Sequence, residues 1–188
     1  MDIRQKYIKQ KQMRQCRFKE TKMNLTFIGM PGSGKSCMGR VISKKLKMKF
    51  IDGDKLIERK YSKKLNELID EVGLEEFKKI EEETLLSITG DNLVISPGGS
   101  AVYYDRAMRH FKQMGIVVYL SVSPKVLIAR LGDFSKRGIV LKDGQTIEDL
   151  HSERVPLMEK YADITLNCDG DAYVKYQREL MDKLKKYL

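Results

Sequence analysis

The 188-residue sequence lacks features that would place it in several large classes of protein. No stretch approaches the roughly 18 consecutive apolar residues of a membrane-spanning helix, so no membrane association is expected. The three cysteines, Cys16, Cys37 and Cys168, are odd in number and show no metal-ligand spacing. They favour a reduced, cytoplasmic setting. No internal repeat or inter-domain linker occurs, and the length is typical of one domain. A monomer is the default expectation for the oligomeric state.

The net charge of +10 is unevenly distributed along the chain. Residues 1–23 contain eight Lys or Arg against Asp2 and Glu20, a net +6, which leaves +4 for the remainder. A nucleic-acid surface needs a basic stripe on the folded domain, so no nucleic-acid partner is expected. The segment also lacks the apolar centre of a secretory signal. Residues 1–23 are therefore interpreted as a disordered basic extension or a start codon placed too early, with a partner-binding arm as the alternative.

Apolar strands alternate with amphipathic helices over residues 24–188, the predicted domain. Strands are expected at 24–29, 49–52, 92–96, 116–123 and 163–167. Helices are expected at 34–48, 55–89 with an interruption at Gly73, 104–115, 124–131, 146–161 and from 171 onward. Residues 132–145 form a polar, glycine-punctuated loop. The alternation predicts an α/β fold, a three-layer α/β/α sandwich with a five-stranded parallel sheet.

Residues 29–36 read G-M-P-G-S-G-K-S and match G-x-x-x-x-G-K-[S/T] at every fixed position. Glycines let successive backbone N–H groups turn toward a phosphate, and the helix that follows adds the positive end of its dipole. Lys35 reaches the outer phosphates and the Ser36 hydroxyl ligates Mg²⁺. The loop therefore predicts a nucleoside triphosphate with magnesium as its ligand. The nucleotide-binding set is Gly29, Gly32, Ser33, Gly34, Lys35, Ser36 and Cys37.

Two further absences narrow the class of nucleotide-binding protein. The guanine-reading run N-K-x-D of GTPases does not occur, and no four-residue apolar strand ends on the metal-binding Asp of motor and transport ATPases. The acids of "IDGD" fill that gap, because Asp52 and Asp54 flank Gly53 where a strand ends. One acid can hold magnesium while the other accepts a proton from an attacking hydroxyl. The alternative is that both only cap the helix that follows.

Seven segments in this order resemble the shikimate kinases, within the nucleoside monophosphate kinase-like group. They are "GMPGSGKSCMGR", "FIDGDKLIE", "EEFKKIEEE", "VISPGGSAV", "VVYLSVSPKVLIARL", "SKRGIV" and "ERVPLMEKYADI". The resemblance covers residues 24 to about 168 and implies a P-loop kinase fold with a mobile lid at about 132–145. It also implies transfer of the ATP γ-phosphate to one hydroxyl of shikimate, in aromatic amino-acid biosynthesis.

The resemblance further assigns roles by position. Lys35, Asp54 and Arg137 would be catalytic, with Arg137 closing from the lid and Asp54 contacting the acceptor hydroxyls. Asp52 and Ser36 would hold Mg²⁺, and Arg130 would lie against the adenine. Arg154, Lys78 and the backbone N–H groups of Gly98 and Gly99 would bind the acceptor. For Arg154 the alternative is an ordinary surface cation, and for Arg130 a helix C-terminal charge.

Four departures from the family pattern lie mostly on the acceptor and lid side. The usual F-R-x-x-E has Lys78 in place of arginine, and the usual three-glycine run ends in Ser100. The lid reads R-G-I-V from Arg137, and the late Pro-Leu-Tyr ends in Met158. Because a lysine offers a point charge where arginine offers a planar fork, the exchange at Lys78 is not conservative, and these departures leave more than one acceptor open. A kinase of another small hydroxy acid, such as homoserine or a sugar acid, or a catalytically weak nucleotide-binding protein are the alternatives.

Overall fold

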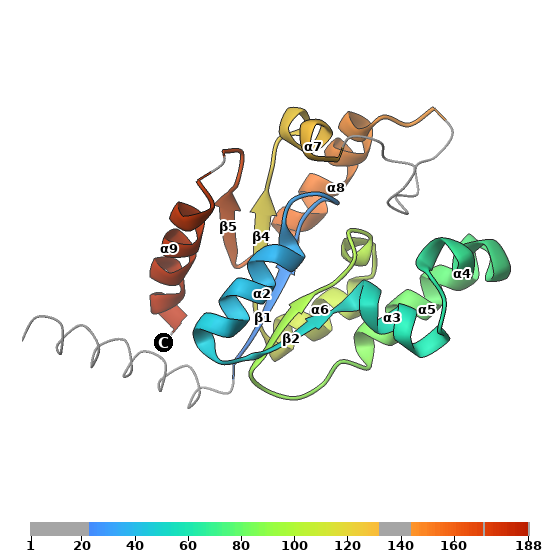
Figure 1. Ribbon diagram of the computed structural model, residues 1–188, viewed down its shortest axis with the longest axis horizontal. Coiled ribbons are helices and arrows are strands. Elements are labelled where there is room, and N and C mark those ends of the chain that lie inside the picture. The colour runs from blue at the N-terminus through green and yellow to red at the C-terminus, as the bar shows by residue number, and fades with distance from the viewer. Residues whose placement is uncertain (1–22, 132–143, 171, 188) are drawn as a thin grey trace, which may run out of the picture.

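Five parallel strands form the centre of the structure, a computed structural model that describes residues 23–131, 144–170 and 172–187 (Figure 1). The strand order is β2-β3-β1-β4-β5. The strands are β1 (Asn24–Ile28), β2 (Lys49–Asp52), β3 (Leu93–Ser96), β4 (Gly115–Ser121) and β5 (Ile164–Asn167). Each of the five strand predictions is confirmed to within two residues at either end.

The central strand β1 is buried along its whole length, and three of its five residues are apolar. It pairs with β3 in the register Leu25 to Val94 and with β4 in the register Leu25 to Ile116. A strand covered on both faces has no solvent side on which to place polar residues. One of its two polar members, Asn24, donates from its amide nitrogen to Gly90 O at 2.8 Å and accepts from Leu93 N at 2.8 Å.

Helices cover both faces of the sheet and complete the predicted three-layer sandwich (Figure 1). On one face lie α2 (Lys35–Leu46) and α9 (Tyr173–Leu184). On the other lie α6 (Asp105–Met114) and α8 (Ile147–Tyr161), with α5 (Leu74–Leu86) packed beside α6. This arrangement leaves the carboxyl ends of the strands open, where ligands of open α/β sheets bind.

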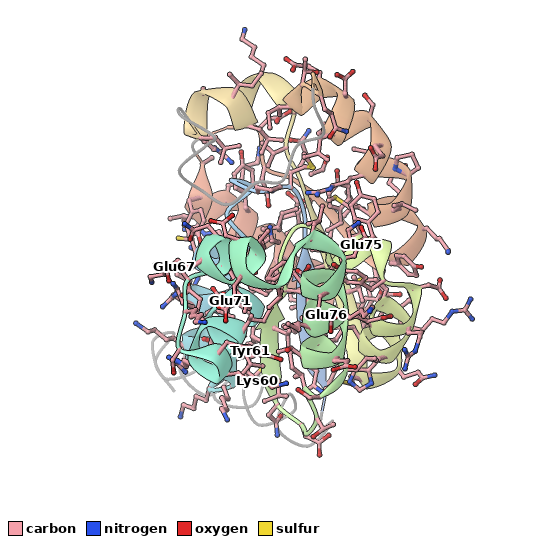
Figure 2. The ribbon with its side chains drawn as sticks, turned by 90° about the vertical axis from the view of Figure 1, so that its right-hand side faces the viewer. Lys60, Tyr61, Glu67, Glu71, Glu75 and Glu76 are labelled. Carbon is pink, nitrogen blue, oxygen red and sulfur yellow. The ribbon has the colours of Figure 1, made fainter. Side chains whose placement is uncertain are left out.

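The helical stretch expected at 55–89 contains one more interruption than predicted. The structure has α3 (Gly53–Tyr61) and α4 (Leu65–Val72) ahead of α5, with breaks at both Ser62 and Gly73. Ser62 adopts the left-handed conformation (φ 55°), which serine enters rarely, so the sequence carried no glycine signal for this break. Figure 2 shows the resulting end of the molecule, where the labelled Glu67 and Glu71 lie on α4 and Glu75 and Glu76 on α5.

The remaining elements are short helices and connections. They are η1 (Ala101–Tyr103), α7 (Pro124–Leu131) and η3 (Lys185–Tyr187); α7 was expected and the two short helices were not. Thr146 caps α8 by accepting from Asp149 N, as its position ahead of that helix favours. Residues 1–22 and most of the expected lid, 132–143 with Arg137, lie outside the described residues. Within the described ranges no helix is long and apolar enough to cross a membrane.

Candidate active site

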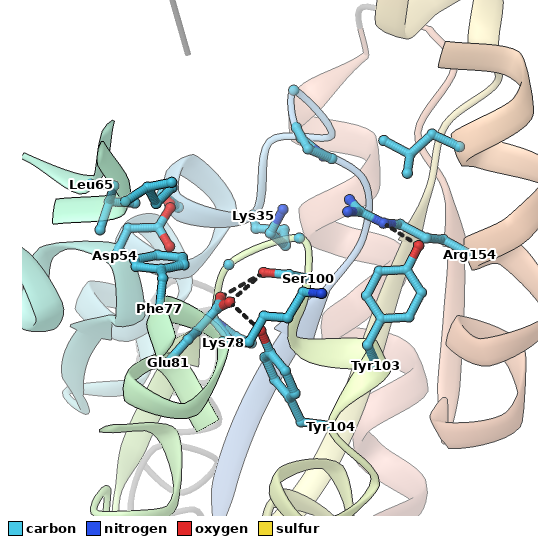
Figure 3. Close-up of a pocket in the computed structure, with 18 of the residues that line it drawn as sticks. Lys35, Asp54, Leu65, Phe77, Lys78, Glu81, Ser100, Tyr103, Tyr104 and Arg154 are labelled. Atoms are coloured by element: carbon cyan, nitrogen blue, oxygen red, sulfur yellow. Dashed lines mark hydrogen bonds between the residues drawn. The ribbon is translucent and has the colours of Figure 1, made fainter. Parts of the chain in front are cut away.

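A pocket of about 810 Å³ opens at the carboxyl ends of β1, β2 and β3. Its walls come from segments far apart in the sequence: the loop after β1, the start of α3, α5, the loop after β3, and α8 (Figure 3). The volume is that of an ordinary small-molecule site. Lys35, Asp54, Lys78, Gly98, Gly99 and Arg154, all predicted site residues, line this one pocket.

The loop from Gly29 to Ser36 has the backbone of a phosphate cradle. Gly32 and Gly34 lie in the left-handed region (φ 80° and 93°). This backbone conformation lets successive N–H groups point into one concave space, as in anion-binding loops. A Cβ atom at Gly34 would meet no atom within 4 Å, so glycine is required there by its conformation and not by crowding. Because α2 begins at Lys35, its free N–H groups and dipole face the same space.

Lys35 presents a half-buried ammonium group to the cradle. Its Nζ donates to Gly29 O at 2.9 Å and to Met30 O at 3.0 Å, both carbonyls of the loop itself. Burial lowers the pKa of Lys35 to about 8, although Asp54 opposes the change. A half-buried cation whose hydrogen-bond partners are neutral carbonyls favours an anionic ligand, so the loop fits the triphosphate that its sequence predicts.

The two acids of "IDGD" have different surroundings. Asp52 is the N-cap of α3, and its Oδ1 accepts a hydrogen bond from Lys55 N at 3.3 Å. This contact agrees with the alternative interpretation in which Asp52 caps the helix that follows. Asp54 lies in the first turn of α3 and its side chain enters the pocket (Figure 3). Burial raises the pKa of Asp54 to about 6, while Lys35 opposes the rise. Lys35 and Asp54 line the same pocket, and the pKa values of both are displaced toward neutrality.

Gly98 and Gly99 form the floor between the two sides of the pocket. A Cβ atom at Gly98 would lie 2.6 Å from Glu81 Oε1 and 2.8 Å from Asp54 Oδ1. A Cβ atom at Gly99 would lie 3.1 Å from Arg154 Nη1 and 2.9 Å from Pro31 Cδ. Both positions thus favour glycine, because neighbouring side chains approach the backbone closely there.

Glu81 is a buried carboxyl group that was not predicted as a site residue. Ser100 Oγ lies 2.6 and 2.7 Å from its two oxygens, and Tyr104 donates its phenolic proton at 2.7 Å (Figure 3). Burial raises the pKa of Glu81. Ser100, which departs from the family pattern, therefore forms hydrogen bonds with this carboxyl group. The pairing arises because the start of η1, where Ser100 lies, contacts α5, which carries Glu81.

Arg154 is buried on α8, with its guanidinium group at the pocket wall. Its Nε donates to the phenolic oxygen of Tyr103 at 3.2 Å, and its Cζ lies 5.1 Å from the centre of the Tyr103 ring. Burial argues against the surface-cation alternative. Tyr103 is the second residue that sequence reasoning missed, because nothing in the sequence indicates that η1 contacts α8.

Lys78 lines the same pocket as Arg154, but its ammonium group has an acidic neighbour on its own helix. Nζ lies 2.6 Å from Glu75 Oε1, one turn earlier in α5, and the lysine side chain is 46% exposed. An exposed pair of this kind is weak, so Lys78 is able to exchange Glu75 for a bound anion.

A second, smaller pocket of about 300 Å³ adjoins the phosphate loop and includes Ser33, Cys37 and Arg130. Arg130 lies in the last turn of α7 and donates to Cys168 O at 2.9 Å and Gly170 O at 3.2 Å. It is thus tied to the loop after β5, in a pocket that it shares with residues of the phosphate loop.

A phosphate loop and an acid that converge on one pocket of a parallel α/β sheet define a P-loop phosphotransferase acting on a small molecule. A model of the shikimate kinase family matches residues 31–186. The chain therefore belongs to the shikimate kinase family.

Individual relatives agree with this assignment. The shikimate kinase of Sulfurihydrogenibium sp. (strain YO3AOP1) is 32% identical over 164 residues, which cover 87% of this chain and 98% of that protein. The crystal structure of shikimate kinase from Aquifex aeolicus matches with a TM-score of 0.76 and 26% identity over 88% of this chain and 98% of that one. Shikimate kinase from Acinetobacter baumannii in complex with shikimate shares the fold (TM-score 0.77, 24% identity, 88% and 94% coverage). These similarities confirm the predicted family and fold, and they give no support to the homoserine, sugar-acid or weak-binder alternatives.

Proposed function

We propose that the protein transfers the γ-phosphate of MgATP to a hydroxyl group of shikimate. The observation that carries the proposal is the convergence of Lys35, Asp54 and Arg154 on one pocket in a chain of the shikimate kinase family. Together they offer a cation for the phosphates, an acid for the attacking hydroxyl and a second cation for the carboxylate of the acceptor.

The phosphate loop binds the nucleotide in this proposal. The N–H groups of residues 32–37 and the Lys35 ammonium receive the phosphates, and Ser36 and Asp52 hold the Mg²⁺ that accompanies them. The pocket beside Arg130 and Cys37 receives the adenine. Arg137, outside the described residues, is assigned to the transferring phosphate from the lid. Magnesium bound with the nucleotide neutralises charge that develops on the phosphate oxygens.

Asp54 orients the acceptor hydroxyl and accepts its proton as the oxygen attacks the γ-phosphorus. One P–O bond forms to the acceptor, the bond from the γ-phosphorus to the bridging oxygen breaks, and ADP leaves. A pKa of about 6 leaves Asp54 mostly ionised at neutral pH yet basic enough to take the proton late in transfer. Lys35, with a pKa of about 8, is mostly protonated at that pH and stabilises the transferring group.

The acceptor carboxylate lies against Arg154, with Lys78 as a second, exchangeable cation. Among the described residues no carboxylate lies within ion-pair distance of Arg154, so its buried charge favours an anionic ligand. The Gly98 and Gly99 N–H groups complete the floor under the acceptor ring. Leu65, Ile69 and Phe77 supply an apolar wall on the opposite side.

A coupled assay of ADP release tests the function. Shikimate, homoserine, gluconate and quinate would each be offered at millimolar concentration with MgATP. We expect turnover with shikimate and no comparable turnover with the others. Failure to phosphorylate shikimate would overturn the proposal, and preferential turnover of another acid would identify the acceptor instead.

Three further assignments accompany the function as proposals. Residues 24–188 form the kinase domain, with residues 1–23 as a basic extension and a lid at about 132–145. The protein acts as a monomer in the cytoplasm, where ATP is available. Size-exclusion chromatography with light scattering would test the monomer, and a dimer-sized particle would contradict it.

A further inference from the structure

Tyr103 contacts the guanidinium group of Arg154 through its hydroxyl group and through its ring. Arginine has five N–H donors, one on Nε and four on the terminal nitrogens. The Nε donor is occupied by the Tyr103 oxygen at 3.2 Å. The ring of Tyr103 lies under the guanidinium group, 5.1 Å from Cζ, within the range of a cation–π contact.

The hydroxyl group of Tyr103 is itself held in one orientation. It donates its single proton to Glu153 Oε1 at 2.6 Å, so its lone pairs remain to accept from Arg154. A directed chain therefore runs from Arg154 Nε–H through the phenol to the carboxylate of Glu153. Each donor in this chain has one acceptor, which fixes the rotation of the guanidinium plane.

The terminal nitrogens of Arg154 point the other way, into the pocket (Figure 3). Nη1 is the atom that a Cβ at Gly99 would approach to 3.1 Å, so this edge faces the floor of the acceptor site. A carboxylate binds arginine in two ways, either across Nε and one terminal nitrogen or end-on across both terminal nitrogens. The Tyr103 contact blocks the first way and leaves the second.

We propose that Tyr103 is a positioning residue that holds Arg154 so that the acceptor carboxylate is received end-on by the two terminal nitrogens. The inference rests on the proposed function, because it takes the acceptor to be a carboxylic acid. Tyr103 does not touch the reacting atoms; it acts through the orientation of Arg154. It thereby contributes to the selection of an anionic acceptor, in a site where the second cation, Lys78, is exposed.

Two substitutions separate the contacts of Tyr103. Tyr103→Phe keeps the ring beneath the guanidinium and removes the hydroxyl, whereas Tyr103→Leu removes both contacts. Tyr187→Phe is the matched control, because Tyr187 is similarly exposed (42% against 40%) and its hydroxyl bonds to Asp163 O, outside both pockets. All variants would be made in the full chain, and their folding compared by circular dichroism.

The kinetic readout compares shikimate with its uncharged methyl ester. We expect Tyr103→Phe to raise the KM for shikimate roughly threefold to tenfold, the loss of about one hydrogen bond, with kcat and the KM for ATP nearly unchanged. The ratio of kcat/KM for acid over ester should fall by the same factor, because the ester makes no charged pair with Arg154. Tyr103→Leu should lower the ratio further, and Tyr187→Phe should leave it unchanged.

A second readout needs no substrate. In ¹⁵N spectra of arginine side chains, the Arg154 Nε–H, assigned by its loss in Arg154→Lys, should exchange slowly in the wild type and rapidly in Tyr103→Phe. An unchanged exchange rate, or an unchanged acid-to-ester ratio in an active Tyr103→Phe enzyme, would overturn the role of Tyr103. A wild-type protein that phosphorylates no carboxylic acid would instead overturn the proposed function, and with it the end-on carboxylate.

Discussion

The ionised carboxylate of Asp54 lowers the stability of the folded protein, and the raised pKa of the group gives the size of this effect. In the unfolded chain the carboxyl group titrates near 3.8, and burial in the folded protein raises its pKa to about 6. Above pH 6 both states are ionised, but only the folded state holds the charge in a poorly hydrated place. The difference of about 2 pH units corresponds to about 3 kcal/mol of lost folding free energy at neutral pH.

Replacing Asp54 with asparagine should therefore stabilise the protein while it abolishes turnover. Asparagine keeps the size of the side chain and removes the charge. For a chain of this length, about 3 kcal/mol corresponds to a rise in Tm of roughly 6–12 °C. ATP binding should persist, because the phosphate loop is untouched.

The stability that Asp54→Asn gains over the wild type should decrease as the pH is lowered. As pH falls from about 6 toward 3.8, the folded wild type takes up its proton before the unfolded chain does. The stability difference between wild type and Asp54→Asn should accordingly shrink from about 3 kcal/mol at pH 7.5 to less than about 1 kcal/mol near pH 4. Below both pKa values it should vanish.

Urea denaturation of both proteins at several pH values measures this difference directly. Asp70→Asn, an exposed acid on α4, is the control and should change stability little at any pH. An Asp54→Asn protein that is no more stable than the wild type at pH 7.5 would refute the reasoning. Loss of ATP binding in that variant would place Asp54 on the metal side and contradict its assignment to the acceptor.

Three other predictions concern the same pocket. Lys35→Ala should cut turnover by about 10²-fold or more, because the transferring phosphate loses its cation; a folded variant with near-normal turnover would remove the proposed role of the loop. The pH profile of kcat/KM for MgATP should be bell-shaped, with an acid limb near pH 6 from Asp54 and a basic limb near pH 8 from Lys35; a flat profile between pH 5.5 and 8.5 would contradict both assignments. Lys78→Arg should leave the KM for shikimate unchanged or lower it by up to about tenfold, since arginine adds a planar fork; a raised KM would show that the lysine is matched to a different acid.

The phosphate loop and the sheet were predictable because their signals are local. The fixed residues of the loop lie within eight positions, and the strand–helix alternation shows its period over a few residues. Asp54 was placed in the pocket by the same logic, since acids that follow one parallel strand lie at the edge where the neighbouring strands also end. These inferences required no knowledge of contacts between distant segments.

The hydroxyl groups around Glu81 and Arg154 were not predictable. Ser100 and Tyr104 reach Glu81 across 19 and 23 residues, and Tyr103 reaches Arg154 across 51. Each pairing depends on the short helix η1, which has too few residues to show a periodic pattern. The break between α3 and α4 at Ser62 was not predicted, because the sequence does not distinguish a serine with positive φ from a serine inside a helix.

The central position of β1 has a consequence for the order in which the protein is made. β1 is the first strand of the sheet in sequence, yet its partners are β3 and β4, and Asn24 bonds to Leu93, 69 residues later in the chain. At about 5–20 residues per second, a ribosome needs roughly 3–14 s to add that length. During this interval a strand that is buried along its whole length in the folded domain has no partner in the sheet. The phosphate loop, which depends on β1 for its position, takes its final shape only after β3 has left the ribosome.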